Sequence, residues 1–287
     1  MLTIYKKELM SFYSGVMGYL IGAFILLFAG LYMYVINFLN GYAEFTYVLG
    51  NLSFIFLIVT PILTMRSIAE ERKQKTDLLL YSLPLSLSKV ILGKFLAMLT
   101  VLAIPVGILC FYPLLLSFFG TVNFAACYSM IFAFLLLGAS LIAMGLFVSS
   151  LTENQVIAAV ITLILVLLNY YLADLAGYLG SSASMSFFLL SLLSTVAAII
   201  IWFFSKSGAV SILFYLVCEL AWGLIWIISP DTMAGLFTTM VTALSVFDRF
   251  NVFGSGIFDL TAVIYLLTVT AVFLFLTLQS MEKRRWS

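Results

Sequence analysis

Residues 125–148 read AACYSMIFAFLLLGASLIAMGLFV and contain no charged side chain. Because a helix rises 1.5 Å per residue, about 20 apolar residues cross the roughly 30 Å hydrocarbon core of a bilayer. Lipid offers the backbone no hydrogen-bond partners, whereas a helix satisfies its own backbone groups. We therefore predict that this segment is a transmembrane helix.

The same pattern recurs along the chain on both sides of this segment. The predicted spans are residues 16–39, 48–65, 95–119, 125–148, 155–178, 186–204, 209–228 and 260–279. The composition agrees, since 64% of the residues are hydrophobic and 9% are charged, whereas soluble domains carry roughly 25% charged residues. We predict an all-α fold, a single polytopic transmembrane helical bundle of about eight spans over residues 1–287. Because 186–204 and 209–228 are short and closely spaced, six spans plus a hairpin is the alternative.

The basic residues fall on one side of this arrangement. If the N-terminus is cytoplasmic, alternate loops place all 13 Lys and Arg residues except Arg249 on the cytoplasmic side. Lys and Arg concentrate in the cytoplasmic loops of membrane proteins. We therefore expect both termini to be cytoplasmic.

Residues 66–94, RSIAEERKQKTDLLLYSLPLSLSKVILGK, form the most highly charged of the predicted loops. Glu71 and Lys75 are spaced four apart and Glu70 and Lys73 three apart, which favours a helix over residues 67–80. Pro84 would end it. One interpretation is a solvated loop that only sets the topology. However, the charges are mixed, and a short helix with both signs is suited to docking on a soluble partner through salt bridges.

Residues 229–259 form the second interruption of the apolar pattern, on the predicted outer side. They combine Pro230 and several acidic and glycine residues with apolar side chains at helical spacing, from Met233 to Leu244. This pattern predicts a segment that lies in the membrane interface or re-enters the membrane.

Several classes of function are excluded by composition. The chain has no His and three widely separated Cys, so a His-ligated metal, a His-based catalytic triad and a CxxC redox pair are unavailable. Its net charge of +1 disfavours nucleic-acid binding. Gly93-Lys94 does not form a phosphate-binding loop, because Ser88 and Phe95 replace residues that such a loop requires. We expect no catalytic residue and no metal site, and an intramembrane enzyme is disfavoured.

Two acidic residues fall within predicted spans. Ionisable residues at membrane depth are costly and often mark a transport path. Glu219 lies near the middle of its span and Asp174 near the outer end of another. Both are candidates for a translocation path, and a purely structural role is the alternative.

Short motifs along the chain resemble one family, the ABC type-2 exporter permeases, and in particular the gliding-motility type. In chain order they are residues 4–9 (IYKKEL), 60–66 (TPILTMR), 69–73 (AEERK), 76–80 (TDLLL), 83–84 (LP), 92–97 (LGKFLA), 246–250 (VFDRF), Gly254, 256–260 (GIFDL), 263–265 (VIY) and 281–286 (MEKRRW). Lys75 stands where many members of the family have glycine, and eight spans exceed the six that are usual there.

The resemblance implies a function for the two interrupting segments. Residues 66–94 would carry the coupling helix that contacts a separate ATPase subunit, and 229–259 the outer re-entrant helices. The expected ATPase contacts are Ile68, Glu70, Glu71, Arg72, Lys73, Lys75 and Asp77. ATP and Mg²⁺ would bind to the ATPase, so this chain would hold no cofactor.

We therefore expect the permease subunit of an ATP-driven exporter in a bacterial plasma (inner) membrane. Its partners would be the ATPase and a second permease copy or homologue, and an auxiliary membrane protein is a further candidate. An ATP-independent carrier or an assembly scaffold is the alternative. The sequence does not identify the cargo.

Overall fold

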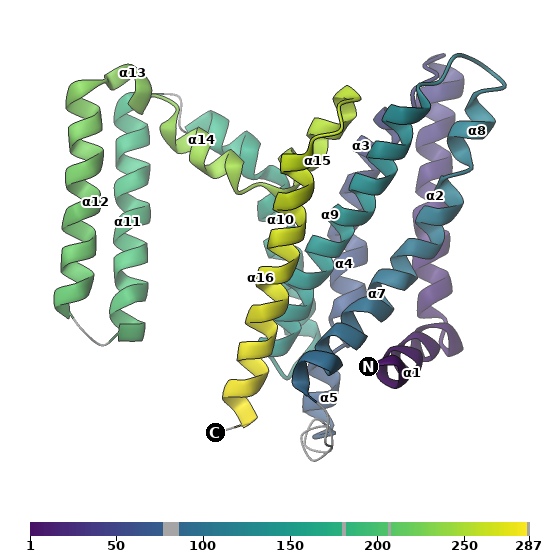
Figure 1. Cartoon of the computed structure of the whole chain (residues 1–287), viewed down its shortest axis with the longest axis horizontal. Coiled ribbons are helices and arrows are strands. Elements are labelled where there is room, and N and C mark those ends of the chain that lie inside the picture. Colours follow the sequence, from purple (N-terminus) through teal and green to yellow (C-terminus); the bar gives the residue numbers. More distant parts are fainter. Residues whose placement is uncertain (77–85, 180–181, 206–207, 286–287) are drawn as a thin grey trace. The chain divides into compact units, whose positions relative to one another are not determined.

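The computed structural model describes residues 1–76, 86–179, 182–205 and 208–285, and every regular element in these ranges is helical (Figure 1). The all-α prediction is therefore confirmed. The chain forms two compact units. Unit 1 comprises Met1–Leu168 and Arg249–Ser287, and unit 2 comprises Asn169–Asp248.

Unit 1 consists of long apolar helices joined by short helical turns. Its helices are α1 (Leu2–Ser14), α2 (Met17–Met33) with the π-helix η1 (Tyr34–Leu39), α3 (Phe45–Leu52), the 3₁₀ turn η2 (Ser53–Ile55), α4 (Phe56–Thr64), α5 (Ala69–Lys73), α7 (Leu87–Leu109), α8 (Tyr112–Leu116), α9 (Phe124–Leu151), η3 (Val252–Ser255) and α16 (Leu260–Arg285). Helices α10 (Gln155–Leu179) and α15 (Val246–Asn251) each run from one unit into the other.

Helix α9 is the central helix of unit 1, and 78% of its most apolar 18-residue stretch is buried. It packs against α16, α7, α4 and α3. Small residues permit this close approach: a Cβ atom on Gly145 would lie 2.4 Å from Thr64 Oγ1 of α4. A polar contact joins α9 to α16, where Ser140 Oγ lies 2.9 Å from the carbonyl oxygen of Leu266. Close packing through small residues and hydrogen bonds between helices are typical of membrane proteins.

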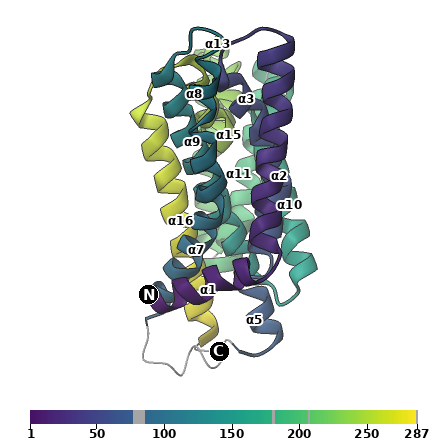
Figure 2. The same ribbon diagram turned by 90° about the vertical axis from the view of Figure 1, so that its right-hand side faces the viewer.

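Helix α1 differs from the long helices because it lies across one end of unit 1 (Figure 2). The half-buried residues of α1 repeat at helical spacing on the face toward α7, and Lys6 and Lys7 are exposed. The two views place α1, α5 and the C-terminal end of α16 at the same end of the unit (Figures 1 and 2). Both termini therefore lie on one side of it, and the assignment of that side to the cytoplasm stays a prediction.

Unit 2 is built around two helices that pack against each other, α11 (Ala183–Ser205) and α12 (Gly208–Ile228). Two short helices follow, α13 (Pro230–Met233) and α14 (Leu236–Ala243). A small core of buried side chains joins the ends of α10 and α11 to these short helices, and it consists of Ala176, Leu190, Met233 and Phe237.

Seven helices in the described ranges are long and apolar enough to cross a membrane. They match the predicted spans except residues 186–204. There the structure has α11, of which Ala183–Ile199 is a shorter apolar helix. Seven of the eight predicted spans are therefore supported by length and composition, and the remaining one, residues 186–204, lies within the 23-residue helix α11, which packs against α12.

Residues 229–259 fold as α13, α14, α15 and η3 rather than as an open loop. Met233, Phe250 and Phe253 in this segment are fully buried. This burial explains why the segment is so apolar, and its depth in the membrane stays a prediction.

Candidate functional site

The predicted helix over residues 67–80 is interrupted. Helix α5 spans only Ala69–Lys73 and ends in a turn at Lys75, whose φ is +58°. The amide of Thr76 donates to the carbonyl oxygen of Glu71 at 2.9 Å, and the amide of Lys75 donates to that of Arg72 at 3.0 Å. This pair of bonds is the Schellman pattern, in which a left-handed residue ends a helix. The prediction of one continuous helix is therefore wrong, while Asp77 and the rest of residues 77–85 lie outside the described residues.

Lys75 is the one residue other than glycine with a positive φ among the residues that the structure describes. The left-handed conformation is free of steric cost for glycine but costs other L-residues roughly 1–2 kcal/mol. Lys75 adopts it here because the two backbone hydrogen bonds of the turn require it. A glycine at this position would form the same turn without strain.

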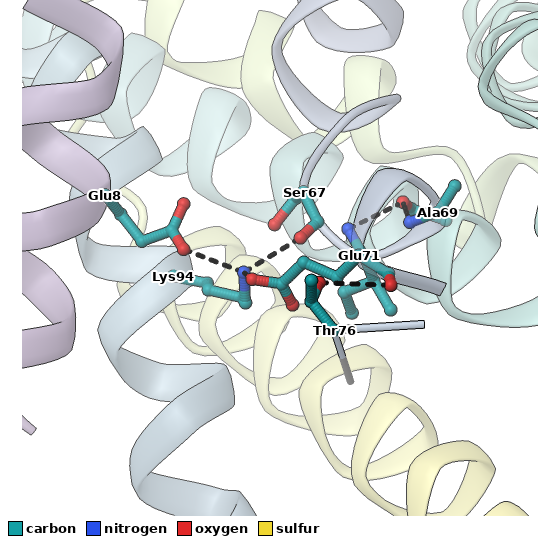
Figure 3. Close-up of polar contacts among 8 residues, drawn as sticks. Glu8, Ser67, Ala69, Glu71, Thr76 and Lys94 are labelled. Carbon is teal, nitrogen blue, oxygen red and sulfur yellow. Dashed lines mark hydrogen bonds and ion pairs between the residues drawn. The ribbon is translucent and has the colours of Figure 1, made fainter. Parts of the chain in front are cut away.

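Lys94 of α7 is the centre of a buried ionic cluster beside this turn, and 2% of its surface is exposed. Its Nζ atom donates to Glu8 Oε1 at 2.8 Å, to Glu71 Oε1 at 2.7 Å and to the carbonyl oxygen of Ser67 at 2.9 Å. Figure 3 shows the three acceptors converging on Nζ. All three donors of the ammonium are therefore used. We call Lys94, Glu8, Glu71 and Ser67 the Lys94 cluster.

Three separate elements meet in the Lys94 cluster. Glu8 comes from α1, Lys94 from α7, and Glu71 from α5. Gly93 allows α1 to approach α7, since a Cβ atom there would lie 3.2 Å from Ile4 Cγ2. Next to it, Tyr5 Oη and Thr100 Oγ1 lie 3.1 Å apart. The cluster thus ties α5 to both the interfacial helix and a spanning helix.

The start of α5 is held by the central helix α9. The backbone amides of Ile68 and Ala69 donate to the Ser149 hydroxyl at 3.2 and 3.1 Å. Ser149 therefore provides a side-chain oxygen for amides that a helix start leaves without intrahelical partners. The start of α5 is consequently fixed to α9, and Glu71 in the middle of α5 is fixed to α7 through Lys94.

The energetics of the Lys94 cluster depend on its being complete. A buried ion pair gains little net stability, because desolvation offsets the Coulomb attraction. Removing one member is costly, roughly 3–5 kcal/mol, because the remaining charge is left buried and uncompensated. The cluster therefore acts as a geometric constraint more than as a source of stability.

The structure separates the predicted ATPase contacts into two groups. Ile68 and Arg72 are buried, and Glu71 is directed toward Lys94. Lys73 and Lys75 are exposed, and half-buried Glu70 accepts a hydrogen bond from Gln74 at 3.3 Å. The outward surface of the α5 turn is consequently more basic than the sequence suggests, and its role as an ATPase contact stays a prediction.

An exposed acidic residue lies near this basic turn. Glu153, in the loop between α9 and α10, forms an ion pair with Arg284 of α16. The hydrogen bond from Arg284 lowers the pKa of the Glu153 carboxyl, and the charges of Arg284, Arg72 and Lys75 lower this pKa further. The α9–α10 loop and the end of α16 are thus joined electrostatically near the α5 turn.

The two candidate path residues lie on different helices of unit 2. Glu219 of α12 accepts a hydrogen bond from the Ser194 hydroxyl of α11, 2.9 Å away. Asp174 is exposed on α10. The structure gives Glu219 a defined partner across the hairpin, and the translocation role of both residues stays a prediction.

The Lys94 cluster was not predicted from the sequence. From the sequence, Lys94 counted as a topology signal, as part of a failed phosphate loop and as part of the motif at residues 92–97. Glu8 was not singled out as its partner. A signal was present, since Lys94 follows the apolar run Val90-Ile91-Leu92 and precedes Phe95 and Leu96. A lysine surrounded by apolar residues in a helix requires a buried acidic partner, because an unpaired buried charge is costly.

These observations define a polytopic helical membrane protein with a rigid, charged turn fixed at one end of its bundle. A family model for the ABC-2 family transporter proteins matches residues 2–286. The chain therefore belongs to the ABC-2 transporter family. The resemblance seen in the short motifs is confirmed at the level of this family, and the gliding-motility type stays a prediction. No curated protein and no solved structure matches the chain.

Proposed function

We propose that the chain is the permease subunit of an ATP-driven exporter of the gliding-motility type. A separate ATPase subunit binds and hydrolyses ATP with Mg²⁺, and this chain holds neither. It works with a second permease copy or homologue in a bacterial plasma membrane. The family membership supports the transport role, since ABC-2 permeases typically pair with an ABC ATPase.

The observation that carries the ATP-coupling part of this proposal is the attachment of α5 at its start to α9 and through Glu71 in its middle to α7. A partner that binds the exposed side of the turn, at Lys73 and Lys75, displaces a segment that these contacts attach to the long helices. Ser149 links that segment to α9, and Glu71 links it to Lys94 of α7 and hence to Glu8 of α1. Movement of the turn is therefore transmitted to two spanning helices and to the interfacial helix.

In the proposed mechanism, ATP binding closes the ATPase subunits and displaces the α5 turn. The helices attached to it then move as rigid bodies between inward-open and outward-open states, a common form of switching transition. Glu219 and Asp174 are proposed as residues of the cargo path. Because transport requires only binding and movement, this chain supplies no catalytic group.

The exposed lysines of the turn provide the test. Glu71 is unsuitable for a charge reversal because it belongs to the Lys94 cluster. Lys73→Glu with Lys75→Glu changes the outward surface and leaves the cluster intact. We expect the affinity for the ATPase to fall roughly tenfold or more, because like charges opposed across an interface cost several kcal/mol. ATPase pull-down and permease-stimulated ATP hydrolysis in nanodiscs measure the effect.

The control is Lys6→Glu, which makes the same kind of charge reversal at an exposed position of α1, outside the turn. It should leave ATPase association unchanged. If the Lys73 and Lys75 reversal inserts normally and retains full association and stimulation, the turn is only a topology signal. The ATP-independent carrier or scaffold would then be the better interpretation.

A further inference from the structure

A cavity of about 760 Å³ opens beside the Lys94 cluster, between the α1–α2 corner and the segment from Arg66 to Thr76. This volume falls in the range of roughly 300–1,000 Å³ that is typical of small-molecule sites. All of its lining residues belong to unit 1. The proposed ATP-coupling function does not use this cavity.

One side of the cavity is apolar and lies at the start of a spanning helix. Phe12 of α1 and Val16, Met17 and Leu20 at the beginning of α2 form it. Because α1 lies across the end of the bundle and α2 is a membrane-spanning candidate, this corner is where the membrane surface is expected. The apolar side is thus at the depth where a lipid chain begins.

The other side of the cavity carries equal numbers of charges of each sign. Its basic residues are Lys7, Arg66 and Lys94, and its acidic residues are Glu8, Glu70 and Glu71. Lys94 is already neutralised by Glu8 and Glu71. Lys7 and Arg66 are exposed and have no hydrogen-bond partner among the described residues.

Two polar atoms at this wall lack partners within the described ranges. They are the hydroxyl of Ser67, a residue that is 7% exposed, and Oε2 of Glu71. A buried polar atom without a partner is unfavourable. Both residues line the cavity, so a hydrogen-bond donor that enters it is positioned to satisfy them after a small side-chain rotation.

We propose that this cavity binds a zwitterionic phospholipid whose headgroup carries a primary ammonium. The phosphate contacts Arg66 and Lys7, because guanidinium and ammonium groups form charge-assisted hydrogen bonds with phosphate. The lipid ammonium donates to Glu70 and Glu71 and to the Ser67 hydroxyl. The first part of one acyl chain lies along Val16 and Leu20.

The charge pattern distinguishes this lipid from two others. A headgroup with a trimethylated nitrogen has the same net charge but no N–H to donate, so it leaves the wall of Glu71 and Ser67 unsatisfied. An anionic headgroup without an ammonium brings no positive charge to Glu70 or to the unpartnered Oε2 atom of Glu71. The primary ammonium headgroup is the one of the three that both places a positive charge beside the carboxylates and donates N–H hydrogen bonds to them.

The experiment titrates the purified full-length chain in detergent with three phospholipids of identical acyl chains, and native mass spectrometry measures binding. The headgroups are phosphoethanolamine, phosphocholine and phosphoglycerol. We expect the ethanolamine lipid to bind roughly tenfold more tightly than the other two, which one additional charge-assisted hydrogen bond supports. No ATPase and no ATP is present, so failure here leaves the proposed function untouched.

Adjacent lysines of α1 provide the matched pair of variants. Lys7 lines the cavity and Lys6 does not, and both are exposed. Lys7→Gln and Arg66→Gln should each weaken binding of the ethanolamine lipid by roughly tenfold, whereas Lys6→Gln should not. Glu70→Gln should reduce the preference for ethanolamine over choline. Thermal unfolding of each variant checks that it is folded.

Four results would overturn the proposal. Equal binding of all three lipids, or equal effects of Lys6→Gln and Lys7→Gln, would indicate lipid that only surrounds the bundle. Tightest binding of the phosphoglycerol lipid would indicate a basic site and exclude the ammonium contacts. Absence of bound lipid would indicate a cavity filled by water.

Discussion

The central helix of unit 1 and the hairpin helix α12 of unit 2 are buried to very different extents. In unit 1, 78% of the most apolar window of α9 is buried, whereas in unit 2 the corresponding value for α12 is 6%. The polar contacts of the two units differ as well, since those of unit 1 include buried charges. Unit 1 encloses the charged Lys94 cluster, while the α11–α12 contact of unit 2 depends on hydroxyl groups and one acid, as in the Ser194–Glu219 hydrogen bond.

This difference indicates where each unit tolerates change. A tightly packed bundle transmits displacement, because close-packed interiors are not continuously deformable. A pair of helices with few buried side chains instead presents its surface to lipid or to other protein. Substitutions of the same chemical kind should therefore have larger effects in unit 1 than in unit 2.

The largest loss of stability is expected for Lys94→Met. This change leaves the Glu8 and Glu71 carboxylates without their cation, and should destabilise the protein by roughly 3–5 kcal/mol. The matched variant combines Lys94→Met with Glu8→Gln and Glu71→Gln, and should recover most of that loss, since replacing a whole buried ionic group is often nearly neutral. Thermal unfolding in detergent measures both variants.

The same two variants also separate stability from coupling. If the Lys94 cluster transmits movement of α5, the triple variant folds but loses permease-stimulated ATP hydrolysis. A triple variant that is stable and fully stimulated would show that the Lys94 cluster is only structural. An unchanged melting temperature for Lys94→Met alone would contradict the burial of the cluster itself.

A smaller change in stability is expected when one glycine of each unit is replaced by alanine. In Gly145→Ala the new methyl group would lie 2.4 Å from Thr64 Oγ1, so α9 and α4 must separate, at a cost of roughly 1–3 kcal/mol. A Cβ atom added to Gly223 of α12 would meet no atom within 4 Å. Gly223→Ala should therefore stabilise its helix slightly, by about 0.5–1 kcal/mol.

Thermal unfolding of the two glycine variants in the same detergent tests the comparison of the units directly. Equal shifts of the melting temperature would show that α12 is packed as closely as α9. That result would require a partner for α12 that survives purification.

The spans could be predicted from the sequence because their determinants are local. Continuous apolar runs such as residues 125–148 identify helices without any knowledge of their neighbours. The family could also be predicted, because each of its short motifs is a run of consecutive residues. Fold class and family are therefore the parts that the sequence predicted correctly.

The site was harder to predict because its determinants are not local. The spacing of Glu71 and Lys75 favoured a continuous helix, but Glu71 pairs with Lys94 and Lys75 turns left-handed. Two tertiary contacts, from Ser149 and Lys94, outweighed the weak preference of an i, i+4 pair, which is about 0.2–0.5 kcal/mol. Glu8 and Lys94 are separated by 86 positions, so no sequence window contains both.

The smallest effect on stability is expected for Glu219→Gln. This substitution is also the sharpest test of unit 2. Glutamine keeps an oxygen that accepts the Ser194 hydrogen bond, and hydrogen bonds between membrane helices contribute about 0.6 kcal/mol on average, so stability should change by less than ~1 kcal/mol. If Glu219 belongs to the cargo path, export should nevertheless fall in cells that carry this variant as their only copy, because the charge is removed. Ser194→Ala is the control, since it removes the donor and retains the charge. Normal export by Glu219→Gln, together with destabilisation by Ser194→Ala, would assign Glu219 to hairpin packing and leave the cargo path to other residues.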